Sequence, residues 1–146
     1  MLLEIVAYSY ASALAAQQGG ADRVELCENT AEGGTTPSLG TIEATRSLPR
    51  LKLHVMIRPR GGDFLYTDAE FRIMLRDIAV ARAAGADGVV FGLLKPDATE
   101  LSGDRQQEIV MIVMAGIEQR YRFADQLAVD GDLFVGEDQL LRIVGH

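Results

Sequence analysis

Cysteine is almost absent from this 146-residue chain, and long apolar runs are missing. The one cysteine, Cys27, excludes an internal disulfide and fits a reducing compartment. No run approaches the roughly 20 apolar residues that a membrane-spanning helix requires. No basic segment precedes the first apolar residues, so we expect no signal peptide. These absences predict a soluble, cytoplasmic protein that does not enter the membrane.

Positive charge is also scarce. The 14 Lys and Arg residues face 21 Asp and Glu, and the net charge of −7 argues against a nucleic-acid partner. The hydrophobic fraction of 48% and the charged fraction of 24% are typical of a globular protein. The length suits a single domain over residues 1–146 with a real core.

Short apolar segments alternate with helical patterns along the first two thirds of the chain. Thr67 and Glu70 form a capping-box pattern before one helix, and Gly85 ends it. This alternation predicts an α/β fold with a parallel sheet and helices packed on it. The residues Gly20–Val24 are echoed at Gly85–Val89, which suggests repeated strand–helix units. We expect strands at 2–7, 23–27, 51–57 and 87–93, and helices at 9–18, 39–47 and 68–84.

The last third has a weaker pattern. The apolar run 109–114 is compatible with a buried strand or with the core of a helix, and periodicity does not distinguish them. We expect a helix at 117–127, a short strand at 133–135 and a terminal helix at 137–144.

Alternation along the strands separates an apolar set from a polar set. A sheet covered by helices on both faces is apolar on both, whereas here one face carries ionisable and sulfur-bearing side chains. This split predicts barrel-like curvature with a polar site on the concave face. The polar set includes Glu4, Glu25, Cys27, His54, Met56 and Arg58.

The loop after the third strand carries two arginines around a proline, followed by a glycine pair and an aspartate. Guanidinium groups and glycine amides are suited to hold a carboxylate or a phosphate. We therefore predict an anion-binding rim formed by Arg58, Arg60, Gly61, Gly62 and Asp63. The alternative is an Arg–Asp pair that only staples the loop.

Five segments resemble, in order and spacing, motifs of the CutC family, which is named for copper homeostasis: Leu3–Ile5, Gly20–Cys27, Glu32–Ser38, Met56–Phe64 and Gly85–Gly92. The resemblance covers residues 1–97 and implies a TIM-type (β/α) barrel, cytoplasmic location and intracellular copper handling. It implies no firmly assigned reaction. Residues 98–146 are predicted to be a divergent tail.

The chain departs from the family pattern in two ways. Val6 stands where many members have a thiol, which leaves Cys27 as the only thiolate. The second departure is that the resemblance fades after about residue 97. A full barrel needs about 200 to 250 residues, whereas this chain has 146. We therefore expect a half-barrel-like fragment of about four or five parallel strands. Its first and fourth strands would then be open edges. The tail would cover one edge, or two chains would pair as a homodimer, or the fragment would be marginal.

Copper binding is the first functional hypothesis. Thiolate, thioether and imidazole ligands select Cu(I), and Cys27, Met56 and His54 fall on the polar face. The alternative is that all three are ordinary interior residues. The family resemblance carries most of this hypothesis, and we expect no organic cofactor.

The second hypothesis is a (β/α)-barrel enzyme that acts on a small anionic molecule through the arginine loop. Glu4 and Glu25 would be its catalytic acid and base. The alternative is that Glu25 and Arg58 form an interior ion pair. Because no nucleophile and no phosphate-binding fingerprint is found, whether the chain is an enzyme stays open. The third hypothesis is a truncated barrel without autonomous activity.

Overall fold

Strands and helices alternate in the computed structural model, which describes residues 2–94, 132–134 and 140–143. The predicted alternation is confirmed, with element ends shifted by a few residues. The elements are β1 (Glu4–Ala7), α1 (Tyr10–Gln18), β2 (Arg23–Leu26), the 3-10 helix η1 (Thr30–Glu32), α2 (Leu39–Arg46), β3 (Lys52–Met56), α3 (Asp68–Ala83), β4 (Gly88–Phe91), β5 (Asp132–Phe134) and β6 (Leu140–Ile143).

The predicted helix starts are confirmed by their hydrogen bonds. Ser9 caps α1, and its side chain accepts from the amide of Ser12 at 3.1 Å. At α3 the Thr67 hydroxyl accepts from the Glu70 amide at 3.3 Å, and the Glu70 carboxylate accepts from the Thr67 amide at 2.8 Å. Each cap satisfies main-chain donors that a helix start otherwise leaves unpaired. No helix in the described part of the chain has the length and apolar composition that crossing a membrane requires.

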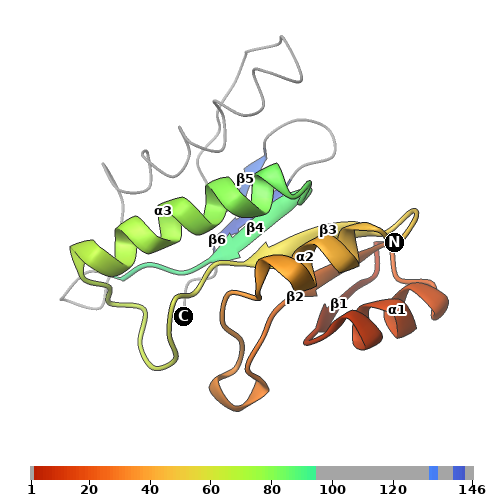
Figure 1. Ribbon diagram of the computed structural model, residues 1–146, viewed down its shortest axis with the longest axis horizontal. Helices are drawn as coiled ribbons and strands as arrows, with labels where there is room; N and C mark the ends of the chain where they lie inside the picture. Colours follow the sequence, from red (N-terminus) through yellow and green to blue (C-terminus); the bar gives the residue numbers. More distant parts are fainter. Residues whose placement is uncertain (1, 95–131, 135–139, 144–146) are drawn as a thin grey trace, which may run out of the picture.

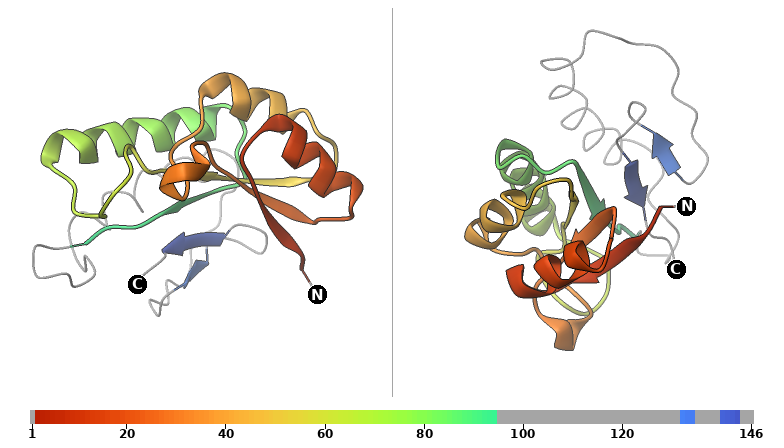
Figure 2. Two further views of the ribbon diagram at one scale, coloured as in Figure 1. Left: turned by 90° about the horizontal axis from the view of Figure 1, so that it is seen from below. Right: turned by 90° about the vertical axis from the view of Figure 1, so that its right-hand side faces the viewer.

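The described strands form one sheet in the order β1-β2-β3-β4-β6-β5. β1 to β4 are parallel, β6 is parallel to β4, and β5 is antiparallel to β6. The helices α1, α2 and α3 lie on the same face of this sheet (Figures 1 and 2). Within the described residues the sheet is open, with β1 and β5 at its edges. The predicted α/β class is thus confirmed as an unclosed TIM-type arrangement.

The tail departs from the prediction. A terminal helix at 137–144 is wrong, because Leu140–Ile143 is a strand. Its residues Arg142 and Ile143 pair with Val90 and Phe91, so a strand of the tail covers the β4 edge, which is one of the alternatives that we expected. The short strand predicted at 133–135 is confirmed one residue earlier. The runs 109–114 and 117–127 lie outside the described residues.

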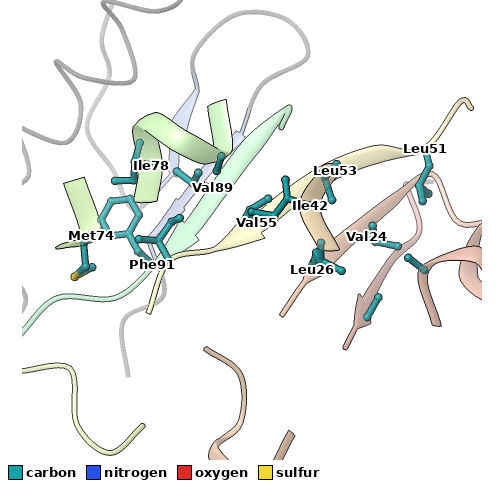
Figure 3. Close-up of a cluster of buried hydrophobic side chains, with 14 of the residues drawn as sticks. Val24, Leu26, Ile42, Leu51, Leu53, Val55, Met74, Ile78, Val89 and Phe91 are labelled. Carbon is teal, nitrogen blue, oxygen red and sulfur yellow. The ribbon is translucent and has the colours of Figure 1, made fainter. Parts of the chain in front are cut away.

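The hydrophobic core lies between the helices and the sheet, and Figure 3 shows part of it. Phe91 of β4 lies close to Met74 and Ile78 of α3, and all three side chains are buried. The apolar sets predicted for the second and third strands are confirmed as core. Leu3 and Ile5 are the exceptions, because they are 41% and 39% exposed on an edge strand that has a neighbour on one side only.

The repeated motif has a structural role at the start of the strands. Asp22 accepts a hydrogen bond from the Leu3 amide at 2.8 Å, and Asp87 accepts one from the Leu53 amide at 2.9 Å. In both cases a carboxylate binds the main chain of the preceding neighbour strand. This end of a β/α sheet is where such residues stabilise the fold rather than carry chemistry.

Candidate metal and anion sites

The register of the parallel strands places the polar side chains in rows across the sheet. One row contains Glu4 and Arg23, and the next contains Glu25 and His54. Register partners in a sheet point to the same face. Glu25 and His54, on neighbouring strands, therefore share the face that the alternation predicted.

Cys27 lies one residue beyond β2, and its amide donates to the Ala7 carbonyl at 2.8 Å. Cys27 and Met56 each follow one member of the registered pair Leu26 and Val55, so they continue the next row. The Cys27 side chain is 1% exposed, and its sulfur lies 3.7 Å from Glu25 Oε1. Burial, followed by the charge and the hydrogen bond of Glu25, raises the pKa of the Cys27 thiol to about 12. The free protein therefore holds a protonated thiol at neutral pH.

His54 is buried to 2% exposure in the middle of β3. Burial, followed by the positive charge of Arg23, lowers the pKa of His54 to about 4, although Glu4 and Asp87 oppose the shift. The imidazole is therefore neutral at physiological pH, which is the form that binds metals.

The lowered pKa of His54 predicts an acid-sensitive fold. Between its ordinary value of 6.5 and about 4, the unfolded chain binds the proton and the folded chain does not. The contribution of His54 to stability is thus fully present above pH 6.5 and is lost as the pH falls toward 4, by about 3 kcal/mol in total. Urea unfolding at several pH values will measure it. A His54→Gln variant with the same pH slope as wild type would contradict the assignment.

Soft donor atoms come from Cys27, Met56 and His54, but these residues lie in two different rows of the sheet. The row of Cys27 and Met56 is about 7 Å from the row of His54, from the ordinary rise along a strand. Among residues 2–94 and the short described strands, no cluster of three or more His, Cys, Asp or Glu is arranged to hold a metal. This set of residue types does not include methionine, whose thioether sulfur can also bind Cu(I). The donor chemistry of Cys27 and Met56 fits Cu(I).

The two carboxylates predicted as acid and base lie in different surroundings. Glu4 forms an ion pair with Arg23 across the β1–β2 register. Glu25 is half-buried beside the Cys27 thiol. Sequence reasoning missed the role of Arg23, although opposite charges on adjacent strands were a usable signal.

Arg60 is saturated with hydrogen bonds. Its Nε donates to Glu70 at 2.6 Å, and Nη1 donates to the carbonyls of Gly61 and Asp63, each at 3.0 Å. Its Nη2 donates to Asp63 Oδ1 at 3.0 Å and to the Leu65 carbonyl at 2.7 Å. A guanidinium has five N–H donors, so an anion would have to displace one of these partners. This geometry matches the alternative in which an Arg–Asp pair only holds the loop in place.

Arg58 is buried to 8% exposure and bonds to main-chain carbonyls. Its Nη1 donates to Glu32 at 2.5 Å and to Gly34 at 2.9 Å, and its Nη2 donates to Gly62 at 2.6 Å. Within the described part of the chain, no carboxylate forms an ion pair with Arg58, so the alternative Glu25–Arg58 pair is not formed.

Two buried polar atoms beside this loop are without a hydrogen-bond partner among the described residues. They are Arg58 Nε and the Tyr66 hydroxyl. Burial raises the pKa of Tyr66, and the positive charge and the N–H donors of the nearby Arg58 side chain oppose that shift. The Arg58 guanidinium and the Tyr66 hydroxyl therefore lie within reach of each other.

A pocket of about 370 Å³ lies between α2 and α3, and the sequence did not predict it. Its polar lining comes from Thr35, Thr36, Ser38, Arg58 and Asp77, and the half-exposed Ile73 also lines it. Burial raises the pKa of Asp77, while a hydrogen bond from Thr36 opposes the shift. No pattern along the chain identified this pocket, because it depends on how two separate helices pack.

Comparison with known families gives a match over most of the chain. The model of the CutC family matches residues 1–129. A CutC family protein of Chromobacterium violaceum is 57% identical over 96 residues, which is 66% of this chain and 39% of that protein. The human copper homeostasis protein cutC homolog is 47% identical over 114 residues, or 78% of this chain and 40% of the human protein. The chain thus spans about 40% of the length of these relatives.

Solved structures agree with the fold. A protein of Streptococcus agalactiae, provisionally named copper homeostasis protein CutC, superposes with a TM-score of 0.68 at 36% identity, covering 80% of this chain and 56% of that one. A protein of Burkholderia cenocepacia, provisionally named a phosphonomutase, gives a TM-score of 0.54 at 18% identity, covering 82% of this chain and 49% of that one. The second similarity concerns the fold alone.

Proposed function

The chain belongs to the CutC family, and from this premise we propose that it takes part in copper homeostasis by binding Cu(I). Human and mouse relatives carry the name copper homeostasis protein cutC homolog. The copper ion is cargo in this proposal, and the protein supplies the ligands.

One observation carries the proposal: the registered pair Leu26 and Val55 is followed on each strand by a sulfur-bearing residue, the only thiol of the chain on one strand and a thioether on the other. Cys27 and Met56 continue the register of β2 and β3, and the neutral imidazole of His54 lies on the same face one row away. Sulfur ligands select Cu(I) over harder ions. Cys27 is the principal ligand, with Met56 and His54 as auxiliaries.

An anaerobic Cu(I) competition titration tests this function. Wild type is expected to take Cu(I) from a calibrated chelator in a 1:1 complex, whereas Cys27→Ser is expected to fail to compete because a hydroxyl is a poor ligand for Cu(I). Met56→Leu keeps the volume and removes the thioether, so it should weaken binding less than Cys27→Ser.

The titration also has an outcome that rejects the proposal. Weak binding that is the same in wild type and in Cys27→Ser would remove the copper function. The remaining functions would then be an anion site or a fragment without autonomous activity.

A small anionic molecule is the second candidate ligand, favoured by Arg58. Its buried guanidinium lies beside the Tyr66 hydroxyl, and among the described residues neither Arg58 Nε nor that hydroxyl has a hydrogen-bond partner of good geometry. Buried charges usually have a partner. We still predict anion binding by Arg60, Gly61, Gly62 and Asp63. The catalytic roles of Glu4 and Glu25 also stay predictions.

We also propose a cytoplasmic location, since a reducing compartment maintains both a free thiol and Cu(I). Pairing of two chains at the β1 edge stays a prediction. It is consistent with the exposure of Leu3, Ile5 and Val6 on that strand.

A further inference from the structure

The loop between β2 and α2 folds back over Cys27. Glu28 and Thr35 close its neck with two main-chain hydrogen bonds of 3.0 and 2.8 Å. The tip, residues 29–34, turns sharply through positive φ at Asn29, Gly33 and Gly34. We name residues 29–34 the Cys27 cover.

Gly34 is the part of the cover that touches the thiol. A Cβ added at Gly34 would lie 3.2 Å from Cys27 Sγ and 3.3 Å from Cys27 Cβ, closer than most side chains pack. Gly34 itself is buried, and its φ of 109° is one that residues with a side chain rarely adopt. Gly34 of the cover therefore lies directly beside the Cys27 side chain, which is 1% exposed.

The Arg58 side chain ties the cover to the rest of the protein. Two of its hydrogen bonds go to the carbonyls of Glu32 and Gly34 in the cover, and the third goes to Gly62 in the loop after β3. Bonds from a charged guanidinium are stronger than neutral ones, and its rigid fork holds both loops in one geometry.

Other bonds around the cover do not involve this side chain. The neck at Glu28 and Thr35 is closed by main-chain groups, and the main chain of Arg58 bonds separately to Thr36. Removing the guanidinium should therefore release the tip and leave the sheet and the neck in place.

We propose that Arg58 is a positioning residue that latches the cover over Cys27, so that a metal ion or reagent reaches the thiol only when the latch opens. The inference rests on the proposed function only if the metal ion that enters is Cu(I). It gives a joint role to Gly34, in the segment Glu32–Ser38, and to Arg58, in the segment Met56–Phe64.

The reaction of Cys27 with 5,5′-dithiobis(2-nitrobenzoate) tests the latch without copper. The thiolate attacks the disulfide, forms a mixed disulfide and releases one thionitrobenzoate per chain. Arg58→Met is expected to react at least about tenfold faster than wild type, because losing two charged hydrogen bonds raises the open fraction. Arg60→Met is the matched control. Its hydrogen bonds lie outside the cover, so its rate should equal that of wild type.

A second pair of variants guards against loss of folding in Arg58→Met. Gly34→Ala places a methyl group against the sulfur and should also speed the reaction. Gly20→Ala is its control, because Gly20 has a similar φ of 88° with no atom within 4 Å of the added carbon. Urea unfolding of each variant separates local opening from global instability.

The outcomes of the two experiments are separable. Equal rates in Arg58→Met, Gly34→Ala and wild type would overturn the latch, even if Cu(I) binds. Faster reaction in these two variants, with both controls at the wild-type rate, would support the latch even if the Cu(I) titration fails. A rate increase in Arg60→Met as large as that in Arg58→Met would also overturn it.

Discussion

Raising the pH from 6 to 10 is expected to strengthen Cu(I) binding by about ten-thousandfold, since each pH unit changes the thiolate fraction tenfold. The reason is the pKa of about 12 at Cys27, which keeps the thiol protonated over the whole range. Cu(I) binds the thiolate, so each binding event releases one proton. His54, with a pKa of about 4, is neutral throughout and adds no proton competition.

The shape of the pH profile distinguishes this buried thiol from an exposed one. A thiol with the ordinary pKa of 9.0 would give a profile that flattens near that pH, whereas Cys27 should give a straight line of unit slope. Competition against a chelator calibrated at each pH measures it. A plateau below pH 9 would show that the thiol is not buried as described.

Glu25→Gln is the matched variant for this measurement. The Glu25 carboxylate is the second cause of the raised pKa of Cys27, after burial. Its replacement should lower that pKa, and binding at neutral pH should strengthen modestly. If Glu25→Gln instead abolishes binding, the carboxylate is itself a ligand and the assignment of Cys27 as principal ligand needs revision.

Replacing Phe91 by alanine is expected to lower the free energy of unfolding by about 3 to 5 kcal/mol, the usual cost of deleting a buried aromatic ring. Phe91 is 1% exposed, and it lies against Met74 and Ile78 of α3 (Figure 3). Its strand lies inside the sheet between β3 and β6. Small domains have a total stability of only about 5 to 15 kcal/mol, so the variant should be close to unfolding.

Urea unfolding followed by circular dichroism measures this loss. Ile73→Ala on α3 is the control, because that side chain is 50% exposed and its removal should cost less than about 1 kcal/mol. Equal effects of the two substitutions would mean that α3 does not pack on β4 as described.

Local patterns were sufficient for the strand–helix alternation and for the caps. Ser9, Thr67 and Glu70 act within one turn of their own helix, so spacing along the chain defines their hydrogen bonds. The strand Leu140–Ile143 was beyond such reasoning. A short apolar run is compatible with helix or strand, and only its pairing with β4 decides between them.

The candidate site was likewise predictable only in part. Alternation placed Glu25 and His54 on one face, because strand geometry has a period of two. It did not distinguish Arg58 from Arg60, which occupy similar positions in one motif. Arg58 reaches the cover 24 to 26 residues away, whereas Arg60 bonds within its own loop and to α3.

The sequence by itself determined the α/β alternation, the family and the identity of the sulfur and imidazole donors, because these depend on local spacing and residue chemistry. Only the tertiary structure decided which arginine holds the β2–α2 loop, how deeply Cys27 is buried and which strand covers β4. Those features depend on contacts between segments far apart in the chain, and on the loss of solvent that such contacts cause.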